Sequence, residues 1–364
     1  MSISMPLLTF ITPPMMDEEQ VYLDEWTHSS RLLFYAVVVI SFVALPILFL
    51  SFCYVKFYRK SHYLPYLCAI LLANFVLLAT LLISVITENT DMIYEAIPGV
   101  IVCKLTAFLV NSSSCFIHWS WVAMYAERFF YIFFPLRLRI LNPCRAKPIL
   151  ITILILSMVI QLWTPIFITG RRIENQFDNI YCGQDPEYSN HARIIMILEC
   201  VGTFFVPLIL TIAADISVLM WKNSCSNHIT LVADDEIRGG GSRKNSHMKI
   251  VSSNSLKNSK KRRSVAIRRC LISATITLFL NLPNYSLQLL DEFFGLRDSP
   301  SIDARRIFLR IDAFVYILYL MQFPITPIHI FLLSRTTNRR ASKQSRHSGA
   351  NSLRVDFHHA TNHV

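Results

Sequence analysis

The stretch CKLTAFLVNSSSCFIHWSWVAMYAERFFYIFFP, from Cys103 to Pro135, decides the fold of this chain. It carries a run of small polar residues, is apolar and aromatic over most of the rest, and closes on Glu127-Arg128-Phe129 before a proline. A helix of about thirty residues is roughly 45 Å long, which is enough to cross a bilayer with tilt. A buried helix with a polar middle and an ionic end needs other helices around it, and the rest of the chain is expected to supply them.

The composition is that of a membrane protein. The chain is 53% hydrophobic and only 16% charged, whereas a soluble chain carries about 25% charged residues. It has only nine glycines and lacks the GxGxxG, P-loop, HExxH and GxSxG patterns and any CxxC pair. We therefore expect no catalytic residues, no metal site and no cofactor. The first residues also lack the basic and apolar parts of a cleavable signal peptide.

Seven apolar segments are long enough to cross a membrane, which predicts an all-α, seven-transmembrane helix bundle. They are Leu32–Phe57, Leu64–Ile86, Val100–Phe129, Pro148–Ile168, Arg193–Trp221, Val265–Leu290 and Phe308–Leu333. Residues 1–31 are then an extracellular segment, 32–333 the seven-transmembrane domain, and 334–364 a cytoplasmic tail. The polar loop at about 223–260, rich in Ser and Asn, is expected to be disordered.

The charges of the loops orient the bundle. Lys and Arg gather in loops 57–63 and 130–147 and in the tail after residue 333, whereas loop 87–99 has none. Because basic loops stay in the cytoplasm, the N-terminus is expected outside and the C-terminus inside. The net charge of +11 therefore reflects topology and a cytoplasmic docking surface, and no nucleic-acid partner is expected.

With this topology, the third span resembles that of a rhodopsin-like (class A) G-protein-coupled receptor. Cys103 and Arg128 are 25 positions apart, as in that family, and Glu127-Arg128-Phe129 resembles its Asp/Glu-Arg-Tyr motif. Pro135-Leu136 is similar to the Pro-Leu of the second inner loop. The prolines of the fifth, sixth and seventh helices are matched by Pro207, Pro283 and Pro327.

The chain also departs from the usual pattern of that family. Asn74 stands where the second helix usually has Asp, Asn281 where the sixth has Trp, and Thr326 where the seventh has Asn. These departures put a sodium site and the standard switch mechanism in doubt. They resemble the divergent rhodopsin-like receptors of invertebrates, especially nematode neuropeptide receptors of the FMRFamide-like kind.

The resemblance implies a disulfide and an output switch. Cys103 would pair with Cys182 on the oxidising side of the membrane, where disulfides persist; the alternative is two free cysteines. Glu127 would hold the guanidinium of Arg128 in the inactive state and release it for a G protein. The alternative for Arg128 is an arginine that snorkels to the inner interface.

The inner surface supplies further candidate contacts for a G protein. Pro135 and Leu136 belong to the second inner loop of the family pattern. Lys261 and Arg268 lie in the basic stretch before the sixth span. That stretch could bind a G protein or anionic lipid headgroups, or it could serve topology alone.

One face of the third helix is polar. Asn111, Ser114, Cys115 and His118 fall at i, i+3, i+4 and i+7, so they share a face that should point into the bundle. Asn111 and Ser114 are either the floor of a ligand pocket or hydrogen-bond partners of other helices, and His118 is expected to be the latter. Receptors for biogenic amines have Asp at the position of Val110, which disfavours an amine ligand.

The outer halves of the other helices carry buried ionisable residues, which are functional candidates by default. Glu199 lies in the fifth span and Asp312 in the seventh, with Arg310 close by. Alternatives are a structural ion pair for Glu199 and a solvated rim charge for Asp312. Acidic groups at a pocket mouth suit a cationic peptide, such as one that ends in Arg-Phe-amide. The candidate ligand contacts on the sixth helix are Asn281, Tyr285 and Gln288.

Together these features predict a multi-pass plasma-membrane receptor for an extracellular neuropeptide, which signals through a heterotrimeric G protein and catalyses no reaction. Two alternatives remain. One is a chemosensory receptor for a small molecule. The other is a membrane transporter, although transporters usually show internal repeats and this sequence has no visible repeat.

Overall fold

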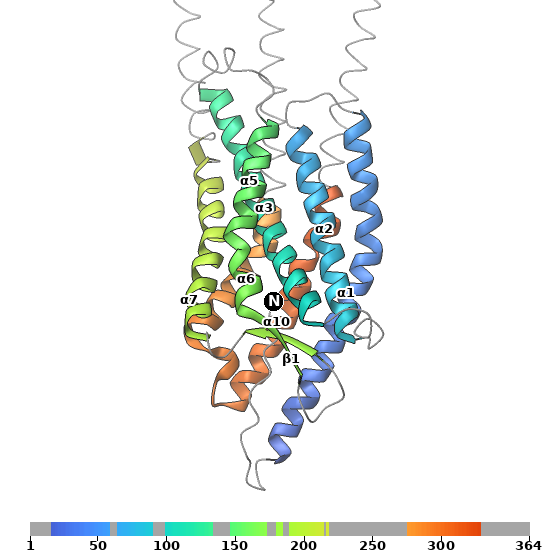
Figure 1. Ribbon diagram of the computed structural model, residues 1–364, viewed down its shortest axis with the longest axis vertical. Helices are drawn as coiled ribbons and strands as arrows, with labels where there is room; N and C mark the ends of the chain where they lie inside the picture. The colour runs from blue at the N-terminus through green and yellow to red at the C-terminus, as the bar shows by residue number, and fades with distance from the viewer. Residues whose placement is uncertain are drawn as a thin grey trace, which may run out of the picture.

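The computed structural model describes residues 16–58, 64–89, 99–133, 146–172, 180–184, 189–214, 216–217 and 275–328. Within these residues, helices run along a common direction and form one elongated bundle (Figure 1). A short β-hairpin lies at one end, beside α6.

The first three helices are long, and the second packs against both the first and the third. They are α1 (Met16–Tyr58), α2 (Leu64–Asn89) and α3 (Gly99–Phe133), and α2 contacts both of the others. α1 begins well before Leu32, where the apolar run starts, so the second half of the expected extracellular segment continues the first helix. α3 ends at Phe133, two residues before the proline that closes the quoted stretch.

The fourth helix is made of α5 (Ala146–Ile160), the 3-10 turn η3 (Gln161–Trp163) and α6 (Thr164–Phe167). Pro165 stands at the start of α6, where a missing backbone N–H costs little. The chain then enters β1 (Ile168–Arg172), which pairs antiparallel with β2 (Ile180–Gln184). The sequence analysis did not predict this outer hairpin.

The fifth helix contains a π-helical turn. It runs through α7 (Ser189–Cys200), the π-helix η5 (Val201–Phe205) and a further helical stretch at 206–214. π-Helical turns are rare and often mark functional sites. This one places Glu199 and Thr203 toward the same cavity.

The last two helices are joined by a tight turn. The sixth helix covers residues 275–294 and ends at Gly295, whose φ of 60° is the left-handed conformation that glycine adopts readily. The 3-10 turn η6 (Leu296–Asp298) leads to α10 (Ile302–Leu320), and helical residues continue at 322–328. The Ser301 side chain caps α10 by accepting a hydrogen bond from the Ala304 N–H.

The surface of the bundle exposes many large apolar side chains. α5 buries Ala146, Leu150 and Ser157 and exposes residues such as Ile151 and Ile155, because the solvent around a membrane helix is lipid. Several threonine hydroxyl groups form hydrogen bonds within their own helix. The hydroxyls of four residues donate to the backbone carbonyl four residues earlier: Thr80, Thr106, Thr211 and Thr326.

Six helices of the described chain are long and apolar enough to cross a membrane. They cover Asp24–Phe57, Leu64–Thr87, Val100–Glu127, Ala146–Phe167, His191–Ala214 and Ile302–Ile328. The remaining helix, at 275–294, carries polar residues in its described part, among them Asn281, Asn284 and Gln288. The predicted all-α seven-helix membrane bundle is confirmed.

Candidate functional site

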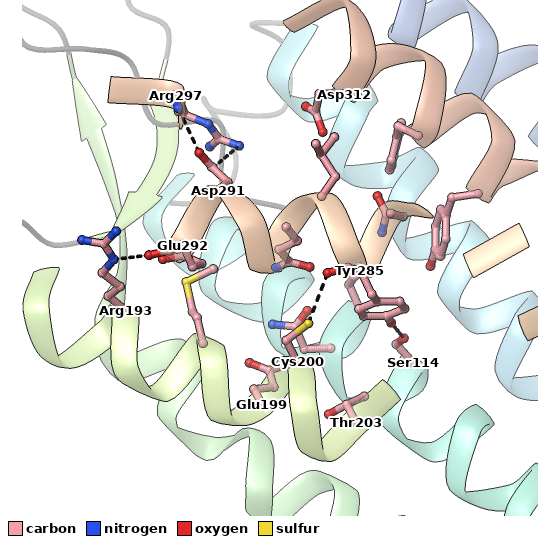
Figure 2. Close-up of a pocket in the computed structure, with 18 of the residues that line it drawn as sticks. Ser114, Arg193, Glu199, Cys200, Thr203, Tyr285, Asp291, Glu292, Arg297 and Asp312 are labelled. Carbon is pink, nitrogen blue, oxygen red and sulfur yellow. Dashed lines mark hydrogen bonds and ion pairs between the residues drawn. The ribbon is translucent and has the colours of Figure 1, made fainter. Parts of the chain in front are cut away.

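A cavity of about 360 Å³ lies within the outer half of the bundle. Its walls come from α3, α7 with η5, helix 275–294 and α10, and the end of the fourth helix and β1 complete it. Figure 2 shows the polar side chains from these separate elements converging on it. Pockets of this size with a few convergent polar groups are the usual form of a ligand site.

The cavity collects six of the seven residues that the sequence analysis named as ligand contacts. These are Asn111, Ser114, Glu199, Tyr285, Gln288 and Asp312. The seventh, Asn281, does not line it: this residue is 1% exposed, and its Oδ1 has no hydrogen-bond partner in the described part of the chain. Asn281 lies one helical turn before Tyr285 on the same helix. The Asn281 side chain is therefore not placed to contact a molecule in the cavity, although it lies on the same helix as Tyr285.

The floor of the cavity is an aromatic cluster fastened by one short hydrogen bond. Ser114 Oγ and Tyr285 Oη are 2.6 Å apart and both residues are buried. The Tyr285 ring stacks on Phe204 of η5, with centroids 4.3 Å apart. Cys200 Sγ donates to the Tyr285 carbonyl at 3.5 Å. α3, the fifth helix and the sixth helix therefore meet at Tyr285.

His118 lies beneath this floor. Its ring meets Phe204 and Tyr285 edge-on, at centroid distances of 5.5 and 5.6 Å. Its Nδ1 lies 2.8 Å from the Ser114 carbonyl of the same helix, and its Nε2 has no partner among the described residues. His118 thus joins helices through ring contacts, whereas the sequence analysis expected a hydrogen bond between helices.

The walls of the cavity carry charged side chains. Four carboxylates line them, from Glu199, Asp291, Glu292 and Asp312, and the guanidinium groups of Arg193 and Arg297 line them too. Glu199 lies near the side chain of Gln161 in η3, whose Nε2 has no hydrogen-bond partner among the described residues. It forms no ion pair with a described residue, so the alternative reading of Glu199 as half of a structural ion pair has no support there.

The two arginines are held by groups at the end of the sixth helix (Figure 2). Arg193 Nε donates to the backbone carbonyl of Glu292. Arg297 pairs with Asp291, with a guanidinium nitrogen 3.4 Å from Asp291 Oδ2. The sequence analysis missed Asp291, Glu292 and both arginines. Asp291 and Glu292 could have been found, because they lie three and four residues after Gln288 and continue its helical face outward.

Arg310, two residues before Asp312 in the chain, pairs with a residue of α1. Arg310 Nε donates to Glu25 Oε1 at 2.6 Å, and Arg306 Nε lies 2.7 Å from Glu25 Oε2. Arg305 lies over the ring of Tyr22, 5.1 Å from its centroid. These contacts join the outer extension of α1 to the start of α10. Asp312 instead faces the cavity, so it is not a freely solvated rim charge.

The inner end of α3 is described only in part. Glu127 is half-buried, and its side chain interacts with the fully buried Tyr66 of α2. Neither Tyr66 Oη nor Glu127 Oε2 has a well-aligned hydrogen-bond partner in the described chain. Arg128 lies in α3, but its side chain is outside the described residues. Four predicted inner contacts are also outside them: Pro135, Leu136, Lys261 and Arg268.

The outer end of α3 carries a bonded cysteine. Cys103 is 2% exposed and disulfide-bonded. Cys182 lies in β2, opposite Gly170 of β1, and β2 contacts α3. The side chain of Cys182 is outside the described residues, so its pairing with Cys103 stays a prediction.

The protein is a seven-helix membrane bundle with a polar cavity in its outer half. Its third helix carries the adjacent residues Glu127 and Arg128 at the inner end. These features together are typical of one class of membrane receptor. The sequence model of the 7 transmembrane receptor (rhodopsin family) matches residues 61–348. This match covers most of the chain, and the protein belongs to that family. It is therefore a multi-pass receptor, typical of the plasma membrane, that signals through heterotrimeric G proteins and is not an enzyme. No curated protein matches the chain.

Proposed function

We propose that this receptor is activated by a cationic extracellular peptide, of the kind bound by the invertebrate FMRFamide-like neuropeptide receptors that its sequence resembles. The observation that carries the proposal is the charge of the cavity. Four carboxylates and two guanidinium groups line it, an excess of two formal negative charges. In a site partly shielded from water, such an excess favours a ligand with positive charge.

The acidic groups are arranged in depth. Asp312 of α10 and Asp291 of the sixth helix lie on the outer part of the cavity, and Glu199 lies beside Cys200 nearer the aromatic floor (Figure 2). A peptide end that enters the bundle would meet carboxylates along its way. The rings of Trp163, Tyr316 and Tyr319 in the walls offer faces for a guanidinium or an aromatic side chain.

The cavity holds only the end of a peptide. A volume of about 360 Å³ is near the lower limit of small-molecule pockets, which is about 300 Å³. The rest of a peptide would lie over the outer surface, where the β-hairpin and the extension of α1 are found. The same volume favours one second candidate, a chemosensory receptor for a small cationic molecule.

Activation would start at the floor. A ligand that binds one arrangement of α3 and the sixth helix more tightly than another shifts the population toward it, and this difference in affinity is the whole driving force. Tyr285 connects the cavity to the sixth helix through Ser114 and Phe204. At the inner end of α3, Glu127 would then release the guanidinium of Arg128, which would become available to the G protein.

The test is a screen of the expressed receptor against a peptide library, with a promiscuous G protein as reporter, followed by carboxylate variants. Glu199→Gln and Asp312→Asn should each reduce the potency of an activating cationic peptide roughly tenfold or more, because each removes the negative charge that strengthens a hydrogen bond to the cation. Asp303→Asn is the matched control, since Asp303 is 85% exposed at the outer end of α10 and does not line the cavity.

Two outcomes would overturn the proposal. One is a receptor that responds only to neutral or acidic ligands. The other is a cationic peptide whose potency survives both variants at equal surface expression. Activation by small cations with no active peptide would favour the chemosensory candidate.

A further inference from the structure

An arginine of the receptor itself, Arg297, lies at the acidic mouth of the cavity. A guanidinium nitrogen of Arg297 lies 3.4 Å from Asp291 Oδ2, and Arg297 stands over the Phe308 ring, 5.8 Å from its centroid. Asp312 lies on the same outer part of the cavity (Figure 2). Arg297, Asp291, Phe308 and Asp312 all line the cavity.

The turn after the sixth helix puts Arg297 there. Gly295 is left-handed, with φ 60°, and its N–H donates to the Asp291 carbonyl at 2.7 Å. This cap reverses the chain, so that Arg297 returns over the helix it has just left. The Arg297 backbone N–H then donates to Asp291 Oδ1 at 2.9 Å.

Because of this backbone hydrogen bond, the turn does not depend on the ion pair between Arg297 and Asp291. One oxygen of Asp291 holds the turn through the Arg297 N–H, and the other oxygen meets the guanidinium. The Arg297 side chain can therefore leave Asp291 while the turn stays closed. It has a path to water, since the side chain is 31% exposed, whereas that of Asp291 is only 14% exposed.

We propose that Arg297 is a tethered competitor: it occupies the cation subsite formed by Asp291 and Asp312, and the positive group of the ligand takes its place. The inference rests on the proposed function, because it assumes a cationic ligand. It identifies Arg297 as a specificity-determining residue. A ligand guanidinium reproduces the interaction it displaces, whereas a neutral group leaves Asp291 unpaired.

Exchange of one guanidinium for another keeps the charge of the mouth unchanged. What the ligand must overcome is the ion pair itself, and partly exposed pairs of this kind are weak. Removal of the Arg297 charge should therefore tighten binding of a cationic probe about two- to fivefold. The gain should be specific to charge, since the shape of the cavity changes little.

The experiment uses the full-length purified receptor in lipid nanodiscs. The probe is the dipeptide Arg-Phe-amide, and its isostere citrulline-Phe-amide is the reference; both are N-acetylated, so that the reference carries no charge. Dissociation constants are measured for wild type, Arg297→Gln, Asp312→Asn and the double variant Arg297→Gln/Asp291→Asn. Arg310→Gln is the matched control, because Arg310 is an outer arginine that pairs with Glu25 and does not line the cavity.

The expected result is tighter binding of Arg-Phe-amide to Arg297→Gln, no change for the neutral dipeptide, no change in Arg310→Gln, and loss of the gain in the double variant. If the double variant fails to fold, Arg297→Gln/Asp312→Asn should show the same loss. A wild type that binds through Asp312 but gains nothing from Arg297→Gln overturns the inference and leaves the proposed function standing. A wild type with no preference for Arg-Phe-amide over its neutral isostere overturns both.

Discussion

Ser114 Oγ and Tyr285 Oη are 2.6 Å apart, although the two residues are separated by 171 positions in the chain. This hydrogen bond joins α3 to the sixth helix at the floor of the outer cavity. Both partners are buried, and Tyr285 is also held by its stacking on Phe204. A movement of the sixth helix relative to α3 must break or re-form this contact.

Loss of the contact is expected to raise basal signalling. Hydrogen bonds between membrane helices average about 0.6 kcal/mol and reach about 1.7 kcal/mol, so Ser114→Ala or Tyr285→Phe should shift the resting equilibrium roughly three- to seventeenfold. Basal G-protein activation at equal surface expression measures the effect. Ser113→Ala is the control, because Ser113 is adjacent but does not line the cavity.

The two substitutions should not add. Each removes the same hydrogen bond, so the double variant Ser114→Ala/Tyr285→Phe is expected to match the larger single effect. Additive effects, or basal activity equal to that of Ser113→Ala, would show that the contact does not restrain the inactive arrangement.

Tyr66 is expected to restrain the inner end of α3. The buried hydroxyl of Tyr66 lies near Glu127, and Tyr66→Phe removes that hydroxyl while it keeps the ring. Glu127 then loses a polar neighbour, which should weaken its hold on the inactive state and raise basal G-protein activation severalfold. Tyr35→Phe in α1, a change of the same kind at a residue that is 63% exposed, serves as the comparison. Unchanged basal activity in Tyr66→Phe would assign the hydroxyl to packing alone.

Arg128→Ala is expected to abolish G-protein coupling and to leave ligand binding measurable. The prediction follows from the position of Arg128 beside Glu127 at the inner end of α3 and from membership in the receptor family. Radioligand or fluorescent-peptide binding and G-protein activation are measured on the same membranes. Full signalling by Arg128→Ala would remove the switch role and leave the snorkelling alternative.

The outer ion cluster is expected to stabilise the extension of α1. Glu25→Gln weakens its pairs with Arg306 and Arg310. Because pairs near a surface contribute about 0.2–1 kcal/mol each, the thermal midpoint of the purified receptor should fall by roughly 2–4 °C. The loss should shrink in high salt, which screens such pairs. Asp24→Asn, one residue earlier and exposed, should leave the midpoint unchanged; an equal fall in both variants would argue against the ion cluster.

The amino-acid sequence was sufficient for the bundle and for most of the pocket. Long apolar runs identify membrane helices because unsatisfied backbone is not tolerated in lipid, and the asymmetry of basic loops predicts their orientation. The helical period places Asn111 and Ser114 on one inward face, and the intramembrane charges of Glu199 and Asp312 mark two further walls. All four line the same cavity.

Only the tertiary structure decided which groups meet. The Ser114–Tyr285 bond, the pairing of Arg310 with Glu25, and the exclusion of Asn281 from the cavity depend on the rotation of each helix within the bundle, which packing sets and one sequence does not reveal. Arg297 is the clearest case. It lies beyond Leu290, the predicted end of the sixth span, and a single left-handed glycine turns it back over Asp291. In Cys103–Pro135, likewise, the period of the helix predicts an inward polar stripe, and the neighbouring helices determine that Ser114 pairs across the cavity floor.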